Sequence, residues 1–204
     1  MKYLSLYKKE TQIMNNYYTM VGARNTPEDV LLLMERLAYK LSLWGWIGRS
    51  GGAGGADTCL EEAISSNLDE GFPSSASRYM EVYLPWKDFN GRYSAHSGYH
   101  TLPDMPNKNN AQVIAETLHP NWNACSQGAQ KLHTRNVYQV LGQDLNTPST
   151  FLVCYAKPKG NGGHVQGGTG TSVKLAIDNG VQVFNMYLEE DRKRIEKWIG
   201  EIIC

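Results

Sequence analysis

Glycines gather at three places where an apolar run gives way to a helical pattern. They are Gly22 in "VGARNTP", Gly51, Gly52, Gly54 and Gly55 in "RSGGAGGAD", and Gly167, Gly168 and Gly170 in "GGTGTS". Backbone without side chains lets several N–H groups converge on an anion, and the dipole of a following helix adds to the attraction. Glycines also serve as plain tight turns. Because the pattern occurs three times, it favours a site for the phosphate of a nucleotide.

Six polar residues beside these loops are candidates for the rest of the site: Arg24, Ser50, Asp57, Lys157, Thr169 and Thr171. The arginine either clamps a phosphate with two hydrogen bonds or is an exposed turn residue. The hydroxyls of Ser50 and Thr171 bind phosphate oxygens or cap helices. The aspartate accepts ribose hydroxyls or stabilises the first turn of a helix. The lysine, like nearby Lys159, contacts a ligand or is solvated, so both interpretations stay open.

The remaining motifs limit the chemistry. No glycine loop ends in the Gly-Lys-Ser/Thr of a P-loop, and none has the G-x-G-x-x-G form with an acid about twenty residues later. ATP hydrolysis and hydride transfer from NAD are therefore disfavoured, and we expect no cofactor. His96 and His100 have the spacing of zinc ligands on a helix, but Gly98 between them indicates a loop, so we expect no metal site.

Composition restricts the partners and the compartment. The 204 residues carry 20 basic and 20 acidic side chains, so binding to nucleic acid would need a local basic patch. The four cysteines form no C-x-x-C pair and are expected to be reduced. The start of the chain, "MKYLSLYKKETQIMNN", lacks the apolar segment of a secretory signal, and no run is long enough to span a membrane. We predict a cytoplasmic protein with no membrane partner.

Strand and helix patterns alternate along the chain. Apolar, β-rich runs predict strands at 16–22, 46–50, 79–86, 149–156 and 180–186. Helical spacing predicts helices at 26–44, with Thr26 as N-cap and Pro27 at the first position, at 57–68, after the last glycine loop, and at 189–203. This alternation is typical of a single α/β domain over residues 1–204. We expect a Rossmann-like, open, mostly parallel sheet with helices on both faces and ligands at the carboxyl edge of its strands.

An insertion interrupts the alternation after the third predicted strand. Residues 87–130 are rich in Gly, Pro, Asn and aromatic side chains and are too long for a plain connection, so we expect a lid over the ligand edge. Trp86, Tyr93, Tyr99 and Trp122 either stack on a base there or pack the insertion onto the sheet.

These motifs resemble a known family. "VGARNTP", "RSGGAGGAD" and "GGTGTSVKLAIDNGVQVFN" look like the SLOG superfamily, which unites the DNA-processing protein DprA (Smf) with the LOG phosphoribohydrolases. The resemblance runs from about Met20 to Asn185 and is strongest to phage-encoded DprA-like proteins, in which "HTRNVYQVLG" with Arg135 and Asn136 also looks familiar. It implies a homodimer or higher homo-oligomer that binds a nucleotide, a nucleotide-derived signal or single-stranded DNA.

The resemblance also bears on catalysis. LOG enzymes carry a motif similar to P-G-G-x-G-T-x-x-E, and its glutamate assists cleavage of an N-glycosidic bond. The matching stretch of this chain has Gln166 at the proline position and Lys174 at the glutamate position. A cation cannot replace that carboxylate. We therefore expect binding without turnover, and, in a phage protein acting in the host cytosol, sequestration of an immune nucleotide signal. The alternatives are DprA-like binding of single-stranded DNA and hydrolysis by another acid, such as Asp57 or Glu28.

Overall fold

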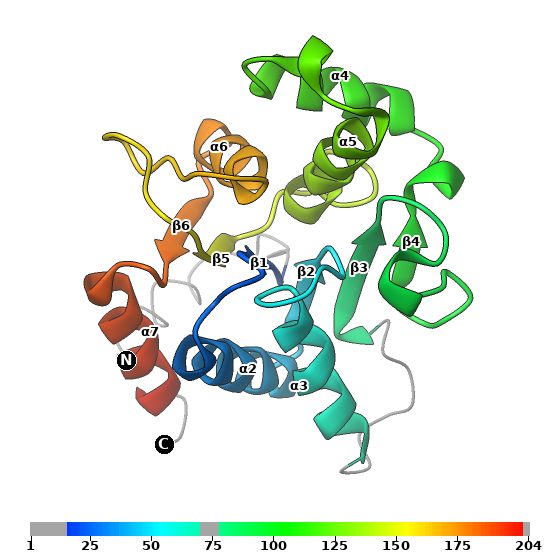
Figure 1. The fold of residues 1–204 in the computed structure, drawn as a ribbon. Helices are drawn as coiled ribbons and strands as arrows, with labels where there is room; N and C mark the ends of the chain where they lie inside the picture. Colours follow the sequence, from blue (N-terminus) through cyan, green and yellow to red (C-terminus); the bar gives the residue numbers. More distant parts are fainter. Residues whose placement is uncertain (1–15, 70–77, 202–204) are drawn as a thin grey trace.

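Six parallel strands form one sheet in the computed structural model, which describes residues 16–69 and 78–201 (Figure 1). The strands are β1 (Tyr17–Gly22), β2 (Ile47–Ser50), β3 (Met80–Leu84), β4 (Tyr99–Thr101), β5 (Phe151–Tyr155) and β6 (Gln182–Asn185). Their spatial order is β4-β3-β2-β1-β5-β6. The predicted α/β class and the Rossmann-like open sheet are thereby confirmed.

The strand order creates a switch point between β1 and β5. The chain adds β2, β3 and β4 in turn on one side of β1, and it then returns to place β5 on the other side. Thr19 of β1 therefore pairs with Arg49 of β2 on one side and with Leu152 of β5 on the other. Loops leaving β1 and β5 therefore turn to opposite faces of the sheet, which opens a crevice between them.

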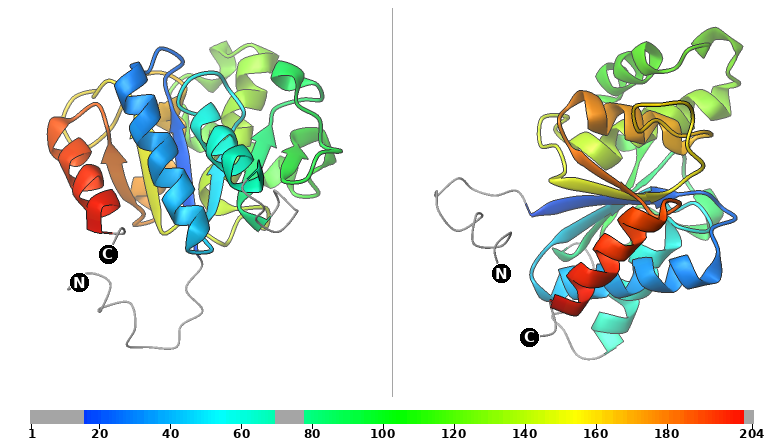
Figure 2. Two further views of the ribbon diagram at one scale, coloured as in Figure 1. Left: turned by 90° about the horizontal axis from the view of Figure 1, so that it is seen from below. Right: turned by 90° about the vertical axis from the view of Figure 1, so that its left-hand side faces the viewer.

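Helices cover both faces of the sheet (Figures 1 and 2). One face carries α2 (Glu28–Leu43), α3 (Thr58–Asp69) and α7 (Glu189–Glu201), and the other carries α5 (Gln127–Leu141) and α6 (Thr169–Asp178), with α4 (Lys108–Leu118) packed outside α5. Each face of the sheet has its own hydrophobic core. Because side chains alternate along a strand, Tyr18 and Met20 of β1 pack in the core under α2, α3 and α7, and Val21 packs in the core under α5 and α6. None of the helices in the described ranges is both long and apolar enough to cross a membrane.

The start of α2 differs by one residue from the prediction. The helix begins at Glu28 after Pro27, and the Thr26 hydroxyl donates to the carbonyl of Ala23 at 2.7 Å instead of capping the helix. This bond closes the turn that follows β1. The predicted stop is confirmed, because Gly45 has φ +75° just past the last turn. Residues 1–15 of the N-terminal segment discussed above lie outside the described residues.

The insertion after β3 extends the sheet. It contains β4 and α4, three short 3-10 turns at Phe89–Gly91, Leu102–Asp104 and Trp122–Ala124, and the first residues of α5. β4 pairs with β3 at the sheet edge, and α4 packs against α5. The part of the insertion around β4 thus lies at one end of the sheet, whereas α4 and the segment after it lie outside α5 (Figure 1).

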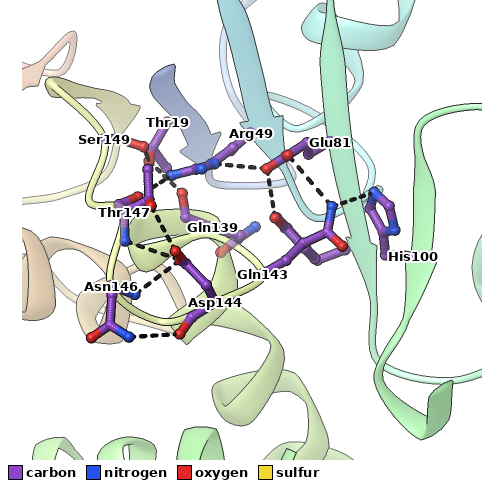
Figure 3. Close-up of polar contacts among 11 residues, drawn as sticks. Thr19, Arg49, Glu81, His100, Gln139, Gln143, Asp144, Asn146, Thr147 and Ser149 are labelled. Carbon is purple, nitrogen blue, oxygen red and sulfur yellow. Dashed lines mark hydrogen bonds and ion pairs between the residues drawn. The ribbon is translucent and has the colours of Figure 1, made fainter. Parts of the chain in front are cut away.

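A buried ion pair joins the middle of the sheet to the connection between α5 and β5 (Figure 3). Arg49 of β2 donates from Nε to Glu81 of β3 at 2.8 Å and from NH1 to the carbonyl of Thr147 at 2.6 Å. The hydroxyl of Tyr83 donates to the same Glu81 carboxylate at 2.6 Å. The Arg49 side chain is only 2% exposed, so its charge depends on these partners.

Candidate functional site

A cleft of about 770 Å³ opens at the switch point, at the carboxyl ends of β1 and β5. Its walls come from the loop after β1, the residues that follow β5, the start of α6 and the facing side of α5. Parts of the chain that are far apart in sequence thus surround one space. Clefts of this size are typical of small-molecule sites.

Seven of the predicted ligand-binding residues line this cleft: Gly22, Arg24, Asp57, Lys157, Gly167, Gly168 and Thr169. At Gly22 a Cβ would lie 2.7 Å from the Cβ of Ala56, so packing alone requires a glycine there. At Gly167 and Gly168 a Cβ would meet no atom within 4 Å. The bare backbone of the last two residues therefore borders open space.

The other seven predicted residues do not line the cleft: Ser50, Gly51, Gly52, Gly54, Gly55, Gly170 and Thr171. The glycine loop after β2 instead makes room for neighbouring parts of the chain. A Cβ on Gly51 would lie 1.3 Å from NH1 of Arg135, and one on Gly55 would lie 2.5 Å from the Ala23 carbonyl oxygen. The Ser50 hydroxyl donates to the backbone carbonyl of Asp57 at 2.9 Å. A ligand contact at these seven residues stays a prediction.

Asp57 and Arg135 form an ion pair at the floor of the cleft. Asp57 accepts the Gly22 N–H at 3.1 Å and lies 3.6 Å from NH1 of Arg135, and each side chain is 5% exposed. Burial raises the pKa of the Asp57 carboxyl, against the opposing effects of Arg135 and the Gly22 N–H, and burial also lowers the pKa of Arg135. The Asp57 carboxylate thus already has partners within the protein, the Gly22 N–H and Arg135. A hydrogen bond from a ribose hydroxyl to this carboxylate stays a prediction.

α5 supplies a polar face that fixes the surrounding loops. Asn136 donates from Nδ2 to the carbonyl of Gly168 at 3.0 Å, which holds the start of α6 against α5. The Gln139 side-chain amide is assigned the orientation in which its oxygen and its nitrogen both have hydrogen-bond partners. In this orientation its oxygen accepts the Gly51 N–H at 2.9 Å, and its nitrogen donates to Asn136 Oδ1 at 3.1 Å. Both residues line the cleft. Arg135 and Asn136 were singled out by the family resemblance, whereas Gln139 was missed.

Two tyrosines supply the aromatic surface of the cleft. Tyr155 ends β5 and Tyr187 follows β6, and their ring centroids are 5.4 Å apart. Sequence reasoning missed both, although Tyr155 stands at the carboxyl end of the most apolar strand. Tyr187 follows a strand at the same edge.

The four aromatic residues proposed for base stacking lie outside the cleft. Trp86 packs edge-on against Phe89, the Tyr99 hydroxyl donates to Glu61 at 2.6 Å, and Trp122 is buried near His133. Tyr93 contacts His96. The insertion places these rings beside β4 or outside α5, and of its residues only Ala129 reaches the cleft. The expectation of a lid over the ligand edge is therefore wrong.

The cationic residues fall into two groups. Arg24 and Lys157 are exposed at the cleft, and among the described residues neither has an ion-pair partner within 4 Å. Lys174, at the position of the LOG glutamate, lies outside the cleft and donates to the carbonyl of Leu118 at 3.4 Å. Apart from Arg135, which is paired with Asp57, positive charge at the cleft thus comes from the loops after β1 and β5.

The paired histidines of the insertion do not form a metal site in the described structure. His96 contacts tyrosine rings, whereas His100 lies 3.2 Å from the Gln143 amide. The three cysteines in the described ranges, Cys59, Cys125 and Cys154, are free thiols, as expected.

Comparison with known proteins adds no assignment. No protein-family model matches the chain, and no curated protein shows significant similarity to it. The geometry of the cleft is therefore the basis for a functional proposal.

Proposed function

We propose that the protein binds a phosphorylated, nucleotide-derived small molecule in the cleft between β1 and β5. The observation that carries the proposal is the position of the cleft, at the switch point of an open parallel sheet and beside bare glycine backbone. Ligands of such sheets bind at this crevice. The SLOG resemblance supports the same ligand class.

The phosphate end of the ligand is assigned to the start of α6. Among the residues that the structure describes, no side chain caps the first turn of this helix, whose N-cap is Gly168, and a Cβ on Gly168 would meet no atom within 4 Å. Backbone N–H groups and the helix dipole favour an anion at such a place. Arg24 and Lys157 supply the compensating positive charge.

The base end of the ligand is assigned to the tyrosine pair. Tyr155 and Tyr187 present ring surface to the cleft, and Tyr187 is 42% exposed. An exposed ring that covers a base gains stacking and loses water contact. The size of the cleft and the zero net charge favour a small molecule over single-stranded DNA, which remains the alternative.

Binding without turnover is the form of activity that the cleft supports best. Asp57 is paired with Arg135, and the lysine at the LOG glutamate position lies elsewhere. If the chain is phage-encoded, such a protein would sequester a nucleotide signal of the host.

Thermal unfolding in the presence of nucleotides tests the proposal. The panel contains mono-, di- and cyclic nucleotides, ADP-ribose and a short single-stranded oligonucleotide. A ligand at a hundred times its Kd adds about 2.7 kcal/mol of stability, so one small nucleotide should raise Tm and be recovered intact. Stabilisation by the oligonucleotide alone, lost steeply with salt, would favour the DNA-binding alternative. Breakdown of the nucleotide would contradict binding without turnover.

Two matched pairs of variants locate the site. Gly168→Ala adds a methyl group inside the cleft, and Gly200→Ala adds one on α7, outside it, in both cases where no described atom lies within 4 Å. Arg24→Gln removes a charge at the cleft, and Arg36→Gln removes one from the exposed surface of α2. We expect Arg24→Gln to weaken nucleotide binding by about tenfold or more, because a charge-assisted hydrogen bond contributes about 1.5–3 kcal/mol. We expect Gly168→Ala to weaken it as well, because its methyl group occupies space that the phosphate would need. Equal affinities within each pair would refute the assignment.

A further inference from the structure

Three metal-binding side chains meet beside the cleft. His119, Cys125 and His133 each offer a ligand atom, and these atoms all lie within 4.8 Å of one another. All three residues are half-buried. Two of them come from the segment between α4 and α5, and the third comes from α5 itself.

The distances fit a tetrahedral ion. Zinc binds sulfur at about 2.3 Å and imidazole nitrogen at about 2.0–2.1 Å, so a tetrahedral angle sets the two donors roughly 3.6 Å apart. Cys125 Sγ lies 3.6 Å from His119 Nδ1. The rings of His119 and His133 are adjacent, with centroids 4.5 Å apart.

Outer contacts prepare both imidazoles. His133 Nδ1 lies 2.7 Å from the Thr171 hydroxyl, and with Nδ1–H donating there, Nε2 carries the free lone pair. His119 Nδ1 accepts the Asn121 N–H at 3.3 Å, so the lone pair of this ring is on Nδ1; both ring nitrogens lie close to the thiol, with Nδ1 3.6 Å and Nε2 3.7 Å from Cys125 Sγ. A metal ion would replace that long hydrogen bond.

We propose that His119, Cys125 and His133 bind one zinc ion, with water as the fourth ligand. A mixed thiolate and imidazole set suits zinc, whereas magnesium and calcium require oxygen ligands. No other His, Cys, Asp or Glu in the described parts of the chain joins the cluster, so one coordination position stays open. The ion would fasten the segment that carries buried Trp122 to α5.

Metal loading of untagged protein tests the site. The chain is stripped with a chelator, and zinc content and cobalt(II) absorption are measured after reloading. We expect one equivalent of metal, visible bands of a tetrahedral cobalt ion, and a thiolate-to-cobalt charge-transfer band. Cys125→Ser should abolish the charge-transfer band, and His119→Gln should weaken zinc binding at least tenfold. The matched control His96→Gln changes an exposed histidine outside the cluster and should leave both signals unchanged.

Folding and nucleotide binding are measured separately. Neither His119 nor Cys125 lines the cleft, so both variants should keep the circular dichroism spectrum and nucleotide affinity of the metal-free chain. Failure to bind zinc or cobalt would overturn the proposal, and so would binding that survives both Cys125→Ser and His119→Gln. If the wild-type chain bound the metal but no nucleotide, the result would count against the proposed function and would leave the metal site supported.

Discussion

At the residue scale, Arg135 occupies the space where Gly51 has no side chain. A Cβ on Gly51 would lie 1.3 Å from NH1 and 2.2 Å from Cζ of the guanidinium. Both atoms belong to a buried group that pairs with Asp57 and cannot swing into solvent. The glycine is thus a requirement of the ion pair below the cleft.

Gly51→Ala should lower the free energy of unfolding by about 2 kcal/mol, because overpacking forces the buried arginine out of place. Gly54→Ala is the control and should have little effect, since its methyl group enters open space. In an Arg135→Ala background the cost of Gly51→Ala should become smaller but should not vanish, because the added methyl group would still lie 2.4 Å from the side-chain amide of Gln139. Urea titrations of the four chains measure this coupling, and additive effects would show that the two residues do not interact.

The sequence shows that the loop after β2 is rich in glycine, but it does not show which part of the chain requires these glycines. Five glycines from Gly48 to Gly55 predict backbone that something approaches closely, and Gly51 is approached closely. The approaching group is a side chain from α5, which no local pattern couples to β2. Gly167 and Gly168 do border the cleft, because they precede a helix at the carboxyl edge of the sheet, where the sequence predicted the ligand-binding loops.

At the element scale, one aspartate organises the turn between α5 and β5 (Figure 3). Asp144 Oδ1 accepts the N–H groups of Asn146 and Thr147, each at 3.0 Å, and Oδ2 accepts the Thr147 hydroxyl at 2.8 Å. The Asn146 N–H is the main cause of the lowered pKa of this carboxyl. Thr147 in turn supplies the carbonyl that accepts a hydrogen bond from Arg49.

The contribution of Asp144 should depend on pH. A group with a lowered folded pKa stabilises fully above its unfolded pKa, about 3.9, and loses the effect as pH falls through the folded value. At pH 7 Asp144→Ala should cost about 1 kcal/mol, a small value because the side chain is exposed. Urea titrations from pH 7 to pH 2.5 should show the wild type and variant converging. A constant difference would contradict an effect of the charge.

Sequence patterns reveal elements that are long or strongly apolar. The run from Ser149 to Ala156 predicts β5 because a strand buried on both faces is apolar throughout. β4 escapes prediction because its three residues, "YHT", carry no periodic signal and become a strand only through pairing with β3. α4 escapes because its buried positions, Ala111 and Ala115, are small.

At the scale of the whole molecule, the buried pair of Arg49 and Glu81 connects two halves of the sheet. It ties β2 and β3 to the loop that leads into β5. Glu81→Gln should lower the free energy of unfolding by about 3 kcal/mol, because it leaves a buried guanidinium without a counterion. Glu189→Gln, which removes an exposed pair with Lys193, is the control and should have no measurable effect. If Glu81→Gln and the wild type were equally stable in thermal and urea unfolding, a stabilising role for the buried pair would be refuted.

The two edges of the sheet limit how copies of the protein can meet. In the described ranges β4 has three residues and β6 has four, so each edge offers few backbone groups for pairing. Short edge strands discourage the growth of a continuous sheet between molecules. A homodimer, which the family resemblance leads us to expect, would therefore join through helices and loops, with each sheet ending inside its own subunit.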